Sequence, residues 1–384
     1  MKKLYVYSLV LLAGLFLSVG RVGAVEEPKQ DADFEDTPAE VTVSDIEGLN
    51  NRINDLAKSA RVNVLLQAQY ANSGVQSLQP KGFKTATGGA SYNDLFLGRR
   101  AEVSFSGDLD NKQVAYRVQY DFLGSTSTKA GVATGSQLKD YWVRLSYIPF
   151  ADIQIGQQRY AQGLEARTSS ADLDFADSAL VTSAVEDRRD LAIQVQSSKV
   201  PLGPLKLEYA VALVQGSGQN TPDNNDNKDL AGRIGLTYGE ADWKVFVGAS
   251  GYDGWESTVA AHSGDRNAFG LEGRVNVGGL KLQGEYIQAQ LEPGNNYNPS
   301  GTALSRPQGW YVSANYRIED WRPGLRAESY TVDSTVGSAN NLNNDVLTAG
   351  LDWFHGHDDV RLSVNFEEHF AQYEQVIGQV QVKI

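Results

Sequence analysis

Arginines recur at the polar positions of an alternating apolar and polar pattern, the spacing that places them on one face of an extended strand. Rows of guanidinium groups make no covalent bonds, but around a pore they attract anions and phosphates. The same faces carry acids such as Glu102, Glu285 and Glu328, so neighbouring charges could instead pair and hold one another in place. The candidate pore-lining residues are Arg100, Arg117, Arg144, Arg159, Arg233, Arg274, Arg317 and Arg361.

A second group of charges lies between two short alternating segments, residues 152–157 and 191–196. The connection, residues 160–188, has no Pro, no Lys and no strict strand period, and it contains six acids against two bases. Connections of this length are usually functional or disordered. If the flanking strands belong to a barrel, the loop folds into the lumen and brings negative charge to the constriction. Its acids would either face the basic wall or hydrogen-bond to local backbone. The candidate constriction residues are Glu165, Arg167, Asp172, Asp174 and Asp177.

The sequence offers no catalytic, cofactor-binding or metal site. It has no cysteine and four histidines, which excludes disulfides and thiolate metal ligands. His355 and His357 precede two aspartates in an expected turn, a pattern more typical of an exposed polar turn than of a metal site. We therefore expect a protein that is not an enzyme and has no cofactor.

The elements that position these charges are strands of period two, which continue from Arg61 to the C-terminus. We count sixteen, joined alternately by short turns and by long polar loops such as residues 72–91, 215–228, 253–266 and 291–308. This layout is typical of an outer-membrane barrel with short periplasmic turns and long extracellular loops. An open edge in lipid would leave backbone groups unpaired, so the barrel must close. The predicted fold is all-β, a 16-stranded antiparallel transmembrane barrel over residues 61–384, with the long third loop folded inward. A soluble sandwich or propeller is the alternative, but its strands rarely alternate so long with large polar side chains on the second face.

The N-terminal part has a different character. Residues 1–24 have a basic start, an apolar stretch and a small-residue cleavage site, which indicates a secretory signal peptide. Without Lys2, Lys3 and Arg21, 31 of the 34 bases remain against 47 acids, a net charge of −16 that argues against nucleic-acid binding. Residues 25–43 are acidic and suggest a flexible segment. Residues 44–60 have apolar side chains at heptad spacing, which indicates a short coiled-coil helix or one amphipathic helix lying on the body of the chain.

Several segments resemble the phosphate-selective porin O and P family. They are residues 99–107 (RRAEVSFSG), 138–142 (LKDYW), 155–157 (IGQ), 163–165 (GLE) with 168–170 (TSS), and 189–191 (RDL). The resemblance covers roughly residues 61–384 and implies a trimeric outer-membrane porin with an inward third loop and a periplasmic coiled coil. Phosphate-specific members of the family place Lys at the constriction, whereas this loop has none and Asp177 follows Phe175 and Ala176.

The expected function is passive diffusion of small hydrophilic solutes across a Gram-negative outer membrane. One alternative is a channel selective for phosphate or polyphosphate. A structural tether is an alternative of another class, in which the barrel is an anchor and the N-terminal helix contacts the cell wall. The expected partners are outer-membrane lipid, two further copies of the chain and small ions or solutes.

Overall fold

The computed structural model describes the barrel and little of the N-terminal region. The described residues are 48, 59–73, 94–109, 112–123, 137–186, 189–223, 226–240, 242–259, 262–291, 306–331, 343–370 and 373–384. The expected signal peptide and acidic segment, and nearly all of the expected 44–60 helix, lie outside these residues. No helix among them is long and apolar enough to cross a membrane.

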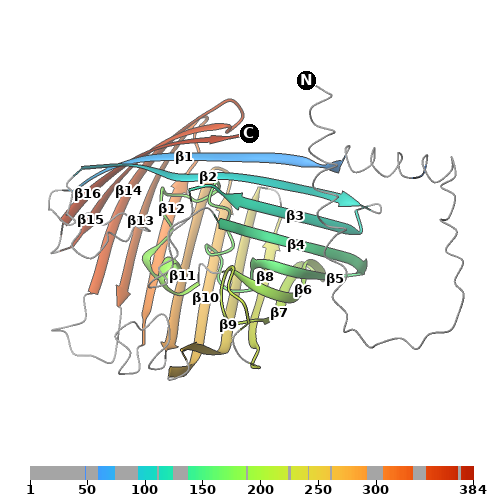
Figure 1. Ribbon diagram of the computed structural model, residues 1–384. Helices are drawn as coiled ribbons and strands as arrows, with labels where there is room; N and C mark the ends of the chain where they lie inside the picture. Colours follow the sequence, from blue (N-terminus) through green and yellow to red (C-terminus); the bar gives the residue numbers. More distant parts are fainter. Residues whose placement is uncertain are drawn as a thin grey trace, which may run out of the picture. The chain divides into compact units, whose positions relative to one another are not determined.

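Sixteen antiparallel strands form one closed sheet within the described residues, which confirms the predicted barrel. Each strand pairs with its neighbours in sequence, and β1 pairs with β16, where Leu66 lies opposite Val382 (Figure 1). The strands are β1 (Arg61–Ser73), β2 (Asp94–Leu109), β3 (Val114–Asp121), β4 (Gln137–Ile148), β5 (Ala151–Arg159), β6 (Arg189–Leu202), β7 (Leu205–Val214), β8 (Asp229–Gly239), β9 (Trp243–Val259), β10 (His262–Val277), β11 (Leu280–Leu291), β12 (Gln308–Tyr316), β13 (Trp321–Thr331), β14 (Asn343–His355), β15 (Val360–His369) and β16 (Tyr373–Lys383).

The period-two pattern sorts side chains as the sequence indicates. Outward residues are apolar and exposed, as Ile234 and Val312 are at 56%. Inward residues are largely polar, and Arg326 and Arg361 are only 1% exposed. Alternate residues of a strand face opposite sides of its sheet, so one set of residues forms an apolar exterior and the other a polar interior.

The connections alternate between short and long, except that the connections between β9 and β10 and between β15 (ending at His369) and β16 (beginning at Tyr373) are both short where a long loop would fall. The expected long loop over residues 253–266 is wrong, because β9 and β10 continue as a paired ribbon to Val259 and His262. The polar composition of this segment suggested a loop. Backbone pairing does not depend on apolar side chains, so the two strands continue.

Two β-bulges turn consecutive charged residues into the barrel. Arg99 is the extra residue where β2 pairs with β1, and Lys139 is the extra residue where β4 pairs with β3. A bulge breaks the strict alternation of a strand. Arg99 and Arg100 therefore both bond to interior groups, as do Lys139 and Asp140.

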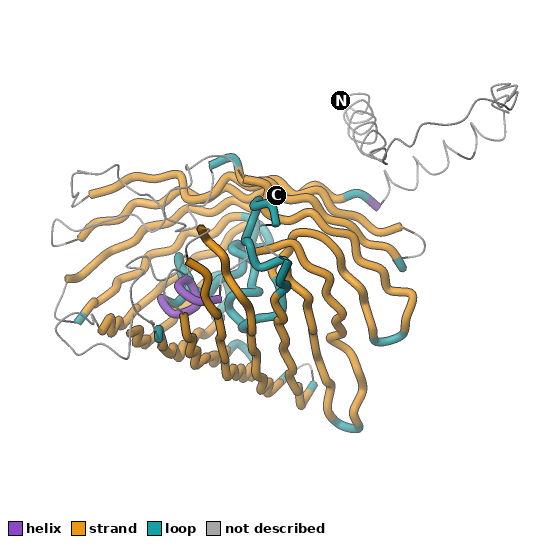
Figure 2. Tube along the Cα trace, turned by 60° about the horizontal axis from the view of Figure 1, so that its bottom comes forward, coloured by secondary structure: helices purple, strands orange, loops and turns teal. Residues whose placement is uncertain are grey.

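The long connection between β5 and β6 folds inside the barrel, as predicted. Figure 2 shows this loop as a tube in the interior, surrounded by strands and ending in a short helix. The helix includes η1 (Thr182–Glu186), a single π-helical turn. We call residues 160–188 loop 3, and the structure describes them up to residue 186.

Candidate functional site

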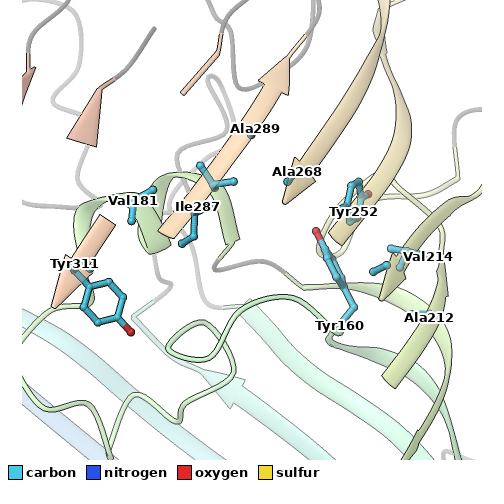
Figure 3. Close-up of a cluster of buried hydrophobic side chains, with 13 residues drawn as sticks. Tyr160, Val181, Ala212, Val214, Tyr252, Ala268, Ile287, Ala289 and Tyr311 are labelled. Atoms are coloured by element: carbon cyan, nitrogen blue, oxygen red, sulfur yellow. The ribbon is translucent and has the colours of Figure 1, made fainter. Parts of the chain in front are cut away.

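Both ends of loop 3 rest on an apolar band inside an otherwise polar barrel. Ala212, Ala231, Tyr252, Ala268 and Ala289 lie opposite one another in register across β7 to β11. The four small alanine side chains leave space that larger residues such as Tyr252 fill, and together they form one buried cluster (Figure 3). The loop contributes Tyr160, Ala179, Val181 and Val185 to this cluster.

Figure 3 shows the Tyr160 ring close to Tyr252, and their centroids are 5.3 Å apart. The Arg266 guanidinium lies 4.1 Å from the Tyr252 centroid and donates a hydrogen bond to the Tyr160 hydroxyl at 3.3 Å. Burial of apolar surface and a cation–π contact therefore hold the loop's first residue against the wall.

The tip of loop 3 is anchored by Phe175, which is 2% exposed. Gly324 and Gly350 are register partners on β13 and β14, and a Cβ at either would lie 3.0–3.3 Å from the phenyl ring. The two glycines thus form a notch for the ring, and the Arg326 guanidinium lies 4.8 Å from its centroid. The neighbouring Ala176 is buried in a second small apolar cluster on β1 and β16.

Wall carboxylates bind the backbone of loop 3. Glu285 on β11 accepts hydrogen bonds from the N–H groups of Leu164 and Glu165, both at 2.7 Å. Glu328 on β13 accepts one from the N–H of Leu180 at 2.6 Å. Hydrogen bonds to charged groups are among the stronger ones in proteins, so these contacts fix the path of the loop.

The three aspartates in the described part of loop 3 form ion pairs with bases of the wall. Asp174 pairs with Lys281 at 2.8 Å and with Arg322 at 3.4 Å. Asp177 pairs with Arg99 at 3.0 Å, and Asp172 pairs with Lys383 at 3.2 Å. Of the two expected arrangements, acids that face the basic wall or acids that hydrogen-bond to local backbone, these aspartates adopt the first. They touch the wall bases directly. Each of these aspartates therefore has a basic partner within 4 Å, and the pairs of Asp174 and Asp177 are largely buried.

Glu165 differs from the candidate aspartates of loop 3. It is buried, and among the described residues it forms no direct ion pair. Its carboxylate accepts the N–H of Ala179 at 2.9 Å and lies near Glu285, Glu328 and Arg326. Burial raises the pKa of Glu165 to about 7, while the Arg326 charge opposes that rise.

The raised pKa of Glu165 predicts a pH-dependent stability. A carboxyl that is easier to protonate in the folded protein stabilises the fold below its unfolded pKa of about 4.5 and loses that contribution as the pH rises through about 7. Glu165→Gln keeps an oxygen that accepts the N–H of Ala179 and has no carboxyl to ionise. The variant therefore avoids the loss of folding stability at high pH, which corresponds to about 3 kcal/mol at pH 8. We expect the variant to melt at a higher temperature than the wild type in detergent at pH 8, and at the same temperature at pH 4. An equal difference at both pH values would contradict this assignment.

A cavity of about 420 Å³ lies on the other side of loop 3, between the loop and the wall formed by β4 to β10. Its arginines are Arg144, Arg167, Arg233 and Arg274, and its acids are Asp152 and Glu208. Arg167 is exposed, and a single long hydrogen bond of 3.4 Å joins it to Gln196. Loop 3 therefore directs three aspartates at one wall and Arg167 at the cavity.

The candidate arginines fall into two groups, of which the first has structural partners. Arg233 pairs with Glu272 at 2.6 Å and also with Glu208. Arg361 pairs with Asp352 at 2.9 Å and donates to the Leu173 carbonyl of loop 3 at 2.6 Å. Arg100 donates to Gln67 at 2.6 Å, Arg159 donates to the Thr168 carbonyl, and Arg117 lies 3.7 Å from Asp140. Arg317 lies in the turn after β12, where it pairs with Asp358 at 2.9 Å.

The second group consists of Arg144 and Arg274. Within the described residues, neither forms an ion pair. Arg274 donates to Gln283 at 3.0 Å, and Arg144 lies 5.5 Å from the Trp142 ring centroid. Together with Arg167 they give the cavity its basic character.

The sequence analysis missed two parts of the site. Arg322 binds Asp174, Asp352 and the Leu173 carbonyl, although it lies only one residue into β13 and next to a proline. The apolar band could have been noticed as alanine at inward positions of four of the five strands β7 to β11, where most other inward residues are polar.

A closed sixteen-stranded barrel with an apolar exterior, a polar interior and a loop folded across the lumen defines an outer-membrane channel. The family model described as Gram-negative porin matches residues 59–366, and the chain belongs to that family. No curated protein sequence matches the chain at a significant level.

Several solved structures share the fold. The chain is similar to Salmonella typhi OmpF in a complex with daunomycin, with 11% identity, a TM-score of 0.58 and coverage of 85% of this chain and 97% of that one. It is also similar to the trimer form of OmpT from Vibrio cholerae, at 8% identity and a TM-score of 0.56, covering 85% and 99%. The outer-membrane channel DcaP of Acinetobacter baumannii gives 14% identity and a TM-score of 0.55, covering 85% and 97%.

Proposed function

We propose that the protein is a passive diffusion channel for small hydrophilic solutes, with a preference for anions. The observation that supports this function most directly is that loop 3 has its paired aspartates on one side and an arginine-lined cavity on the other. Its aspartates are bound to wall bases, while Arg144, Arg167 and Arg274 line the cavity on the opposite side. A solute passing the loop therefore meets more guanidinium groups than carboxylates, since the cavity is lined by four arginines and two acids, and guanidinium groups attract anions.

Recordings from planar bilayers test this function. The purified full chain should give discrete conductance steps in KCl, because an aqueous path crosses the barrel. The structural tether, in which the barrel only anchors an N-terminal segment that contacts the cell wall, would give a folded, membrane-inserted protein without such steps. Heat-modifiable migration in gels verifies folding, so an absence of steps from folded protein contradicts the channel proposal.

Selectivity for phosphate or polyphosphate is the second candidate. The arginine-lined cavity favours it, as does the resemblance to the phosphate-selective porin O and P family. The loop has no lysine, and Asp172, Asp174 and Asp177 are paired with wall bases, so the basic groups that line the cavity are the arginines. The arginine cavity supports anion preference in general, and chloride and phosphate permeabilities measured on one channel would separate the two candidates.

The proposal includes an assembly and a domain organisation. We propose a homotrimer in outer-membrane lipid, a cleaved signal peptide over residues 1–24, an acidic flexible segment over residues 25–43, and a periplasmic coiled-coil helix over residues 44–60. One of the similar structures is described as a trimer form. Sedimentation of detergent-solubilised protein with and without residues 25–60 tests whether the helix contributes to trimer stability.

A further inference from the structure

The connection between β7 and β8 begins with a short segment that is folded against the barrel. We call residues 215–221 the strap. It contains left-handed backbone at Gly216 (φ 92°), Gly218 (φ 88°) and Asn220 (φ 55°), which glycine adopts freely and asparagine more readily than most other residues. Ser217 between the two glycines is only 3% exposed. The strap therefore has a defined fold of its own.

The strap binds both strands from which loop 3 departs. Asp190 on β6, just after loop 3, accepts hydrogen bonds from the N–H groups of Gly216 at 3.0 Å and Gly218 at 2.8 Å. Gln157 on β5, just before loop 3, accepts one from the N–H of Asn220 at 2.7 Å. The side chains of Asp190 and Gln157 are buried, at 3% and 2% exposure. Both ends of loop 3 are thus tied to one segment of a different connection.

The strap also bonds to the neighbouring strand β4. The pairing of β4 with β5 ends where Tyr141 lies opposite Gln157, so Leu138 lies beyond the last paired residue. The Leu138 carbonyl accepts a hydrogen bond from Gln219 at 2.9 Å and one from the Asn220 side chain at 3.0 Å. Gln157 donates to the same carbonyl at 2.9 Å. These bonds satisfy a backbone acceptor that has no partner on β5, and they join the strap to β4 as well as to β5 and β6.

A second route leads from the strap to the first residue of loop 3. A Cβ on Gly216 would lie 2.6 Å from the carboxylate of Asp229, so the strap packs closely on this group. Asp229 accepts hydrogen bonds from the Tyr252 hydroxyl and, at 2.9 Å, from the N–H of Trp255. The Tyr252 ring packs against Tyr160, where loop 3 begins. The strap therefore contacts the surroundings of loop 3 through two separate sets of groups.

We propose that the strap couples the exposed part of the β7–β8 connection to loop 3, so that a macromolecule bound to this connection changes the passage through the barrel. This inference rests on the proposed channel function and adds a regulatory input at the surface. Hydrogen-bonded and packed elements of this kind carry coupling between distant sites, and the coupling is established by measuring how a change at one site alters the other.

Asn220→Pro tests the coupling without a change in any strand. Proline has no N–H to donate to Gln157 and cannot adopt a φ of 55°. We expect loop 3 to become more mobile and the open-channel noise of the full chain to rise about twofold. Hydrogen exchange of folded protein in detergent should become about tenfold faster at the amides of Leu164 and Ala179, which bond to carboxylates behind loop 3.

Two further variants serve as controls. Asn220→Gly keeps the N–H and accepts the left-handed backbone, so noise and exchange should stay close to the wild type. Asp226→Pro places the same residue in the exposed part of the same connection, outside the strap, and it should have no effect on loop 3. Folded Asn220→Pro with wild-type noise and wild-type exchange of loop 3 overturns the coupling. An equal effect of Asp226→Pro overturns the assignment to the strap.

A bound macromolecule tests the regulatory input directly. The sequence has no cysteine, so Pro222→Cys provides a single attachment point on an exposed residue directly after the strap. Streptavidin bound to a biotin label at this cysteine loads the strap, and we expect the open-channel noise to rise about twofold. Phe370→Cys is the matched control, because this exposed residue lies in the connection between β15 and β16, at the same end of the barrel. Streptavidin at residue 370 should leave the noise unchanged.

The outcomes separate this inference from the channel function itself. Folded protein that gives no conductance steps contradicts the channel, while hydrogen exchange of loop 3 in Asn220→Pro still tests the strap. Normal conductance with equal effects of streptavidin at residues 222 and 370 indicates obstruction of the mouth and overturns the regulatory input. An effect at residue 222 that persists unchanged when Asn220→Pro is added overturns the route through the strap.

Discussion

Phe175→Ala should raise the single-channel conductance and the open-channel noise of the protein. The ring is 2% exposed in the notch formed by Gly324 and Gly350, and it is the main apolar anchor at the tip of loop 3. Removing a buried phenyl ring costs about 3–5 kcal/mol. Losing this amount at one anchor loosens the tip, which is then held by the ion pairs of Asp174 and Asp177, while the apolar band still holds the two ends of the loop.

A complementary change at the notch should act in the same direction. Gly350→Leu fills the notch from the wall side, because a Cβ at this position already lies 3.0 Å from the ring of Phe175. Phe269→Ala is the matched control, since this phenyl group faces outward and is 47% exposed. If Phe175→Ala and Phe269→Ala leave conductance and noise equally unchanged, the tip of loop 3 does not limit the passage.

Combining Arg144→Gln, Arg167→Gln and Arg274→Gln should abolish or reverse the anion preference of the channel. A unit charge about 8 Å from a solute contributes about 1 kcal/mol at an effective dielectric constant of about 40, roughly a fivefold change in local anion concentration. Three such changes outweigh the remaining basic groups of the cavity, because Arg233 is bound by Glu208 and Glu272. The reversal potential in a KCl gradient gives the ratio of chloride to potassium permeability.

The triple variant needs a control for folding and for overall charge. All three side chains lie in the lumen and carry no ion pair within the described residues, so heat-modifiable migration should remain that of the wild type. Lys112→Gln changes the charge outside the cavity and should leave the permeability ratio within experimental error. A triple variant that folds and keeps the wild-type ratio would show that other groups set the selectivity.

The barrel could be predicted from local pattern because alternation acts within each strand. Successive side chains of a strand point to opposite faces, so Leu66 faces outward and Gln67 inward independently of distant parts of the chain. The sixteen strands then pair in sequence order to close the barrel. The same reasoning assigned the arginines of the strands to the interior. The assignment of side chains by alternation failed at the bulges of Arg99 and Lys139, because these bulges follow from backbone pairing and not from composition.

The partners of loop 3 could not be predicted in the same way. Asp174 and Lys281 are 107 residues apart, and Arg361 and Leu173 are 188 apart, so only closure of the barrel brings them together. The composition of the loop indicated a negative constriction, because it counts acids without their partners. The structure pairs the aspartates with wall bases and leaves Arg167 exposed on the side of the cavity.

The sign of the reversal potential of the wild-type channel in a KCl gradient tests the pairing of these charges most directly. Aspartates neutralised by wall bases, beside a cavity lined by arginines, predict that chloride is more permeant than potassium. A channel that favours potassium would contradict this account, because the carboxylates of loop 3 would then face the permeating ions.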